Sequence, residues 1–474
     1  MAKTVQLDDR GYRKFGIRDK LAYAAGDLGC NMSFALKGTV SIFWTQYMQV
    51  SLEAMAILML IVQVWDAIND PIIGSMVDAD KKQYKRNKFL QYIWVGSIGL
   101  LVAGAAMFLP FPNAPMVLKY VLFVVGYIMW DAFYTIANVP YGSLLSLITS
   151  EPGERASLSV FRSVGSMAGN MVPPMILPFL IYDSNNNLKG QVVFFAALIM
   201  GVIGFLFFMF MIKNIVIRGN EYAQLNDEGG EKVNLVKSLG TFLKNRPAVG
   251  CTLAAMGMFL GMQSATTANT IMFATHFGNA SMSGLVMMVG FLPMFIFMPF
   301  ATKLVKKHGK KEVASIGSIA GLIGGAILCV FPLCPFNLQL VVYMIGLVFF
   351  GLGMGFYNCV SWAMMGDAID YQEWKFGKRE ESVVYALHSF FRKLAQGVGP
   401  AAVIAIMGTP LIGYVSSLGT IGQSAETAGR LCWLVAGLYT FSAVCQFVGV
   451  AIIYNIDKKT LAQMTEELAE RKAK

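Results

Sequence analysis

Residues 57–74 read ILMLIVQVWDAINDPIIG, and they place Asp66 and Asp70 one helical turn apart inside an apolar stretch. A carboxylate at bilayer depth costs roughly 2.5–3.5 kcal/mol even on the lenient insertion scale. Two carboxylates on one helix face also repel each other. Such a pair persists only where a cation or a proton lies with it, so the stretch predicts a membrane protein that moves something together with a cation.

The composition around this stretch is that of a polytopic membrane protein. Of the 474 residues, 56% are hydrophobic and only 14% are charged. The first 20 residues are polar and basic, so we expect no cleavable signal peptide. The seven cysteines fall in or beside apolar segments without metal-ligand spacing, so we expect no disulfide framework and no cofactor apart from a coupling ion.

Hydropathy predicts an all-α membrane fold of twelve transmembrane helices in two six-helix bundles. The apolar segments cover approximately 20–49, 52–77, 89–110, 117–148, 157–182, 191–212, 248–276, 282–304, 313–334, 338–366, 383–413 and 425–454. We divide the chain into a cytoplasmic N-terminus (1–19), a first bundle (20–212), a cytoplasmic linker (213–247), a second bundle (248–454) and a cytoplasmic tail (455–474).

The net charge of +10 is distributed as a topology signal rather than as a nucleic-acid surface. Of the 38 Lys and Arg residues, only Lys119 and Lys189 fall in predicted outer loops, and most others lie in predicted cytoplasmic segments. This asymmetry indicates cytoplasmic termini and a multi-pass protein of the cell membrane, with lipids as partners and no nucleic acid. Five basic residues fall inside predicted helices: Lys37, Arg162, Arg392, Lys393 and Arg430.

The two halves of the chain resemble each other. Phe161-Arg162 in the fifth apolar segment matches Phe391-Arg392 in the eleventh, nearly half the chain away. A basic run follows both the second and the eighth segment, at 81–86 and 303–311. Six plus six helices with an internal repeat is a recurring transporter plan, with the binding site between the halves.

Helical spacing brings oxygen-bearing side chains together on two segments. Asp66, Asn69 and Asp70 share an arc of about 100° on the second segment. On the fourth segment, Asp131, Thr135 and Asn138 share another arc, which could face the first. The Thr135 hydroxyl and the Asn138 carbonyl could complete the ligand shell of Na⁺ or Li⁺, for which Asp66 and Asp70 supply the carboxylates. Alternatively, mutual repulsion leaves one carboxyl group protonated.

A resident basic side chain could instead neutralise the acidic pair and hold the helices together. The candidates are Lys37, Arg162, Arg392 and Lys393. We favour a mobile cation, because these few residues would have to compensate Asp66, Asp70 and Asp131 and leave no positive charge for a cavity. Lys37 could also extend toward the membrane surface or pair with Asp27.

The stretch Trp65–Gly74 resembles the second helix of the glycoside–pentoside–hexuronide:cation symporters, the melibiose-permease group of the major facilitator superfamily. Further similar stretches are Lys20–Tyr23, Gly26–Gly29, Tyr134–Ile136, Pro140-Tyr141 and Gly366–Tyr371. The resemblance implies alternating access by two rocking bundles. It also implies a cation site at Asp66, Asn69, Asp70 and Thr135, with the family's fifth-helix arginine and eleventh-helix lysine at Arg162 and Lys393.

Departures from the family pattern concern the sugar site. Where melibiose permease has a Lys-Asp pair on the first helix, this chain has Cys30-Asn31. Asn138 replaces an aspartate, Gly142 and Tyr357 replace tryptophans, and His388-Ser389 replaces a Gln-Thr pair. We expect substrate contacts from Asn31, Asp131, Asn138, Gly142, Arg162, Tyr357, His388, Lys393 and Lys37. Asn31 could equally join helices, and His388 could be an ordinary interface residue.

We therefore predict a monomeric secondary transporter, not an enzyme, that imports a glycoside, pentoside or hexuronide by symport with Na⁺, Li⁺ or H⁺. Loss of two carboxylates with retention of the basic residues favours an anionic solute such as a hexuronide. The alternatives are a uniporter or exchanger of the same fold, a cation-coupled carrier of an amphiphile or lipid, and a sensor or structural membrane protein that transports nothing.

Overall fold

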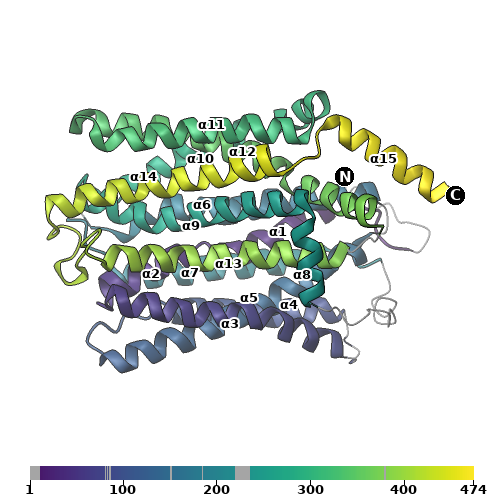
Figure 1. Cartoon of the computed structure of the whole chain (residues 1–474). Coiled ribbons are helices and arrows are strands. Elements are labelled where there is room, and N and C mark those ends of the chain that lie inside the picture. Colours follow the sequence, from purple (N-terminus) through teal and green to yellow (C-terminus); the bar gives the residue numbers. More distant parts are fainter. Residues whose placement is uncertain are drawn as a thin grey trace, which may run out of the picture. The chain divides into compact units, whose positions relative to one another are not determined.

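The computed structural model describes residues 11–80, 82, 84, 87–149, 152–183, 185–218, 235–377 and 381–473. Helices account for most of this part of the chain, and an isolated bridge joins Tyr182 and Leu188. The chain divides into two compact units, Met1–Gly230 and Glu231–Lys474. Within each unit the long helices run along a common direction (Figure 1).

The N-terminal unit carries the first six apolar segments. Its helices are α1 (Ile17–Phe34), α2 (Lys37–Ile42), α3 (Leu52–Ala79), α4 (Lys88–Ala106), α5 (Met116–Ile148), α6 (Pro152–Ile181) and α7 (Gly190–Asn214). The first apolar segment, predicted as one helix over 20–49, is interrupted. It forms α1, a turn at residues 35–36, α2 and a π-helical turn at Phe43–Tyr47.

The C-terminal unit carries the other six apolar segments. Its helices are α8 (Leu235–Lys244), α9 (Arg246–Thr275), α10 (Met282–His308), α11 (Lys310–Val330), α12 (Phe336–Phe376), α13 (Glu381–Gly408), α14 (Ala425–Phe447) and α15 (Lys458–Ala473). Helix α8 lies inside the stretch expected to be a linker, and α14 continues as π-helix over Val448–Ile453. Figure 1 shows α15, in yellow, extending from the end of the unit.

Side-chain caps begin several of these helices. The Ser51 hydroxyl accepts a hydrogen bond from the Ala54 amide at the start of α3. The Asn87 side chain accepts from the first amides of α4, and Asn245 from the Ala248 amide of α9. These polar residues satisfy amides that lack a partner within the helix. At the other end of α12, Gly377 adopts a positive φ of 71°, which glycine tolerates best.

The two units repeat the same pattern of helix pairs. In the first, α1 packs on α6 and α7, α3 on α5, and α4 on α5 and α7. In the second, α9 packs on α13 and α14, α10 on α12, and α11 on α12 and α14. Each pair occupies equivalent positions in its half of the chain. The internal repeat predicted from Phe161-Arg162 and Phe391-Arg392 is therefore confirmed as a structural repeat.

Glycine permits the closest of these helix approaches. A Cβ atom at Gly165 of α6 would overlap the Ala24 carbonyl oxygen of α1, and one at Gly351 of α12 would overlap the Gly290 carbonyl of α10. Small residues at crossings let helix backbones pack directly, as is common in membrane bundles.

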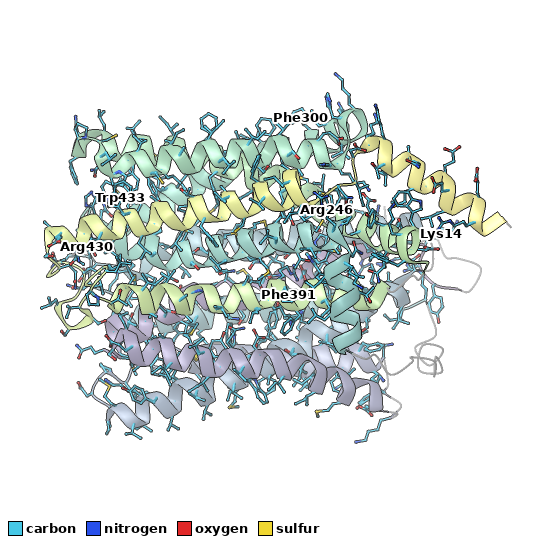
Figure 2. The ribbon with its side chains drawn as sticks, in the orientation of Figure 1. Lys14, Arg246, Phe300, Phe391, Arg430 and Trp433 are labelled. Carbon is cyan, nitrogen blue, oxygen red and sulfur yellow. The ribbon has the colours of Figure 1, made fainter. Side chains whose placement is uncertain are left out.

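The surface is that of a membrane protein. Nine helices within the described ranges are long and apolar enough to cross a bilayer by length and composition. Large apolar side chains are exposed on several of these helices and on α10. Trp433 of α14 is 47% exposed and Phe300 of α10 is 54% exposed (both labelled in Figure 2). The fold is an all-α membrane fold, as predicted. The cytoplasmic location of the termini remains a prediction.

Candidate functional site

Asn69 joins α3 to α5 at the centre of the candidate cation site. Its side chain is 1% exposed. The Asn69 amide nitrogen donates to Asp131 Oδ2 at 3.0 Å and to Thr135 Oγ1 at 2.9 Å. The sequence predicted one possible ligand shell from side chains of these two segments, and the structure brings these three residues into contact. The Asn69 carbonyl oxygen is buried and has no hydrogen-bond partner among the described residues.

Lys37 brings a positive charge to the same cluster. Its Nζ atom lies 3.6 Å from Asp66 Oδ2, and both side chains are largely buried. The Gln63 side chain donates to that oxygen at 2.9 Å. The ammonium also lies 5.0 Å from the Phe34 ring centroid and 5.6 Å from that of Tyr127, within range of a cation–π interaction.

Lys37 and Asp27, which the sequence offered as a possible pair, have other charged partners in this structure. Lys37 lies beside Asp66 of α3. Asp27 lies instead beside Arg162 of α6, with 3.4 Å between Oδ1 and Nε. The Arg162 guanidinium lies 5.0 Å from the Tyr141 ring centroid, and the Tyr141 hydroxyl donates to the Tyr23 carbonyl on α1. Both basic residues predicted inside these helices therefore lie next to a carboxylate.

Three further members of the predicted cation and sugar sites lie on α3 and α5. Asp70 is on α3, but its side chain is outside the described part of the structure. Asn138 follows Thr135 by one helical turn on α5 and is half-buried. Gly142 lies one turn further, and a Cβ atom there would meet no heavy atom within 4 Å. The loss of a large ring at this position therefore leaves open space.

Asn31 makes the contacts expected of a residue that joins helices. Its amide nitrogen donates to the Asp27 carbonyl at 2.8 Å and to Ser166 Oγ of α6 at 3.3 Å. Its carbonyl oxygen accepts from Asn170 at 2.6 Å. These bonds use most of its hydrogen-bonding capacity, so the alternative of helix packing has direct structural support.

In the C-terminal unit, α13 places His388 and Arg392 one turn apart. His388 is buried, and its Nδ1 atom lies 2.9 Å from Thr252 Oγ1 on α9. The Arg392 guanidinium lies 5.1 Å from the Trp362 ring centroid and 5.3 Å from that of Phe259. Lys393, the next residue, is half-buried. This aromatic and basic cluster is the candidate site within the C-terminal unit.

Tyr357 differs most from its expected role. Its side chain is 1% exposed, and its hydroxyl donates to the Cys251 carbonyl of α9 at 2.9 Å. The ring therefore offers no surface to a sugar in this structure, because it packs within its own unit. The reason is the local environment on α12, where the tyrosine side chain turns toward α9.

Sequence reasoning missed several contributors. Phe34, Gln63 and Tyr127 surround the Lys37–Asp66 pair, and Trp362 and Phe259 flank Arg392. Gln63 was recognisable, because it is a polar residue three positions before Asp66 in an apolar helix. The aromatic partners carried no such signal, since the chain holds 34 phenylalanines.

The chain is similar to known transporters over nearly its whole length. A family model described as MFS/sugar transport protein matches residues 22–458. The uncharacterized symporter YjmB of Bacillus subtilis is 30% identical over 469 residues, with 97% of this chain and 96% of that protein covered. The isoprimeverose transporter of Lactiplantibacillus pentosus is 26% identical, with 96% of this chain and 92% of that protein covered.

A solved structure agrees on the fold. The crystal structure of a D-xylose-proton symporter superposes with a TM-score of 0.59 and 17% identity, covering 91% of this chain and 96% of the other. At this identity the likeness concerns the fold alone.

Proposed function

This chain belongs to the MFS/sugar transport proteins, and on that premise we propose that it imports a sugar or glycoside by symport with a monovalent cation, Na⁺, Li⁺ or H⁺. The resemblance to the glycoside–pentoside–hexuronide:cation symporters is confirmed at the family level, and the family consists of membrane transporters rather than enzymes. The cell membrane is its proposed location, and a monomer its proposed form.

The observation that carries the proposal is the buried polar cluster of α3 and α5. Asp66, Asn69, Asp131 and Thr135 place carboxylate, amide and hydroxyl oxygens in an apolar bundle. Buried ionisable groups at this depth are expensive and are retained for function. A cation bound here would stabilise the conformer that holds the solute, and by linkage the solute would increase cation affinity by the same factor.

Open space and polar groups support a sugar as the solute. Gly142 leaves room on α5, and Asn138 one turn away offers both a donor and an acceptor. Polar residues such as Asn138 and Arg162 argue against an amphiphile or lipid as cargo. The names of two relatives, a symporter and an isoprimeverose transporter, also support a sugar as the solute.

Charge bears on whether the solute is a neutral sugar or a sugar acid. Lys37 and Arg162 each lie beside a carboxylate, so they offer less attraction to an anion than their number suggested. The remaining support for a hexuronide comes from α13, where Arg392 and Lys393 are adjacent and aromatic rings flank Arg392. Arginine can bind a carboxylate through two parallel hydrogen bonds.

Uptake into proteoliposomes tests the proposal. Isoprimeverose, D-xylose and a phenyl glucuronide serve as probes, with an imposed Na⁺, Li⁺ or pH gradient. We expect accumulation of at least one probe only when a cation gradient is present. Accumulation that is independent of every gradient would indicate the uniporter alternative, and absence of counterflow for all probes would oppose the proposal.

Two single variants test whether transport depends on the buried polar cluster of α3 and α5. Asp66→Asn should reduce gradient-driven accumulation at least about tenfold while solute counterflow persists, because the amide keeps the shape but removes a charge. Glu426→Gln is the matched control, since Glu426 is an exposed carboxylate at the start of α14. Unchanged accumulation in Asp66→Asn would contradict the assigned role.

A further inference from the structure

The loop between α13 and α14, residues 409–424, exposes large apolar side chains at the surface of the C-terminal unit. We propose that this loop lies on the membrane and inserts these side chains between the lipid headgroups and the acyl chains. Figure 1 shows the loop at the end of α14 that is away from α15. Its most exposed apolar residues are Leu411, Leu418 and Ile421, at 70%, 54% and 62%.

The loop is uncharged over its whole length. Residues 408–425, GTPLIGYVSSLGTIGQSA, contain no Asp, Glu, Lys, Arg or His. In the N-terminal unit, the equivalent connection between α6 and α7 is short and polar. Residues 182–189, YDSNNNLK, include Asp183, Lys189 and three asparagines. The internal repeat therefore offers a direct comparison. A connection at this position can be short and charged, so a long uncharged loop with exposed apolar side chains indicates a different environment.

The loop also provides hydrogen-bond partners for its own backbone. The Gln423 side chain accepts from the Val415 amide at 3.0 Å and donates to the Val415 and Gly419 carbonyls at 2.6 Å. Further bonds run from loop amides to carbonyl oxygens within residues 407–416; the donors are Ile412, Gly413, Tyr414, Leu418 and Gly419. Where water is scarce, an unpaired backbone group is costly, so a segment there must supply its own partners. This hydrogen bonding suits a loop that rests in the membrane interface.

An exposed apolar stripe of α14 leads to this loop. Trp433, Phe441 and Val444 are exposed, and their spacing places them on one face of the helix. Helix α14 belongs to a segment that is long and apolar enough to cross a bilayer, so such a face is the one that lipid covers. Tryptophan near the end of a membrane-spanning helix is typical of the interface with water. Trp433 therefore marks the interface at this end of α14.

Arg430 connects the stripe to the loop. It lies one turn before Trp433, forms an ion pair with Glu426 and donates to the Pro410 carbonyl at 2.9 Å. Figure 2 labels Arg430 and Trp433 toward the same end of α14. Leu411 follows Pro410 directly, so the exposed side chains of the loop begin beside an arginine and a tryptophan, two residue types that favour the headgroup region. This continuity favours lipid over a second protein as the partner of the loop.

Fluorescence quenching in lipid nanodiscs tests the assignment. Leu418→Cys and Ile421→Cys are made separately in a background in which the seven native cysteines are replaced, and each receives a small fluorophore. The matched control is Asn187→Cys, at an exposed position of the equivalent connection in the N-terminal unit. Melting curves first establish that each labelled protein is folded. Quenching by lipids that carry a nitroxide just below the headgroup is then compared with quenching by iodide in the water.

We expect the ratio of lipid quenching to iodide quenching to be at least about threefold higher at positions 418 and 421 than at 187, because interfacial side chains lie about 5–10 Å inside the boundary between headgroups and acyl chains. The same ratio at all three positions would overturn the inference. Protection from both quenchers at 418 and 421 would also overturn it, because protein rather than lipid would then cover the loop.

Hydroxyl-radical labelling of the wild type in nanodiscs provides a second readout that needs no cysteine-free background. These radicals oxidise side chains that water reaches. Relative to the denatured protein, the peptide with residues 411–423 should be protected more strongly than the peptide with residues 182–189. Oxidation of Leu418 and Ile421 at the rate seen in the denatured protein would contradict their insertion. Neither measurement requires transport, so both outcomes are independent of the proposed solute and coupling ion.

Discussion

Two basic side chains within helices of the N-terminal unit lie beside acidic ones. Lys37 lies 3.6 Å from Asp66, and Arg162 lies 3.4 Å from Asp27. Removal of one partner leaves the other as an uncompensated charge in an apolar environment, which destabilises more than removal of both. Single substitutions at these positions therefore mix two effects, loss of function and loss of stability.

A double-mutant cycle on Arg162 and Asp27 separates these effects. Arg162→Gln should lower the free energy of unfolding by about 1–3 kcal/mol, because Asp27 is 5% exposed and loses its counter-charge. Arg162→Gln/Asp27→Asn should lose less than the single variant. Thermal or chemical unfolding in detergent measures the difference. Strict additivity of the two substitutions would show that the pair does not couple.

The sequence predicted the residues of the acidic cluster better than their partners. Helical spacing predicted that Asp131 and Thr135 share one face of the fourth segment, as Asn69 shares a face of the second segment with Asp66 and Asp70. The contact between the two faces comes from the packing of α3 against α5. The partner of Lys37 could not be obtained this way. It depends on the interruption of the helix at residues 35–36, between α1 and α2, and on how α2 packs beside α3. The burial of Tyr357 could not be predicted from the sequence either, because it depends on packing against α9.

At the scale of elements, hydropathy located the long helices to within a few residues. The predicted segment 117–148 is α5 at Met116–Ile148, and 191–212 is α7 at Gly190–Asn214. Hydropathy failed where helices continue beyond the apolar core, as α12 does to Phe376. It also failed at the break in the first segment, because apolar residues continue through the turn.

Two glycines on neighbouring elements should respond oppositely to the same substitution. Gly165→Ala places a methyl group against the backbone of α1 and should destabilise by about 1–3 kcal/mol. Gly142→Ala meets open space and should be neutral or stabilising by up to about 1 kcal/mol, since alanine favours helix. Melting temperatures of the two variants provide the comparison. Equal decreases in melting temperature for the two variants would mean that α1 and α6 do not approach each other as closely as described.

The end of α3 provides a pH-dependent contact outside the membrane-spanning segments. Asp80 accepts hydrogen bonds from the Tyr84 hydroxyl at 2.6 Å and the Lys82 amide at 3.0 Å. These bonds lower the pKa of Asp80 from its ordinary 3.8 to about 2. A carboxyl group with a lowered pKa stabilises the folded state above its ordinary pKa, and the contribution fades as pH falls from about 4 toward 2.

Asp80→Asn should therefore lower the Tm at pH 7, and the difference from the wild type should shrink below about pH 4. Circular dichroism melts at a series of pH values measure it. Glu470→Gln, at an exposed carboxylate on α15, serves as the control and should show no comparable trend. A constant difference at all pH values would show that the charge of Asp80 does not contribute.

At the scale of the whole molecule, the two units share a plan but differ in chemistry. The N-terminal unit gathers carboxylates, amides and Lys37, whereas α13 of the C-terminal unit gathers Arg392, Lys393 and aromatic neighbours. The predicted preference for an anionic solute therefore depends on α13.

Matched solutes test this dependence. Uptake of a phenyl glucuronide should exceed that of the corresponding phenyl glucoside by about tenfold, a ratio equivalent to about 1.4 kcal/mol. Arg392→Gln should reduce the ratio, because the bidentate carboxylate contact is lost. Arg430→Gln, an exposed arginine at the start of α14 and labelled in Figure 2, should leave the ratio unchanged. Preference for the glucoside would contradict an anionic solute.

The repeated helix pairs have an evolutionary consequence. The same five pairings in both halves are what an ancient gene duplication leaves behind, because backbone packing constrains descent more tightly than side-chain identity does. The copies were then free to specialise. In this chain one half carries the buried acids of α3 and α5, and the other carries aromatic rings around Arg392. In a protein built this way, substitutions in one half can change which solute is carried, while the residues of the other half that bind the coupling ion stay the same.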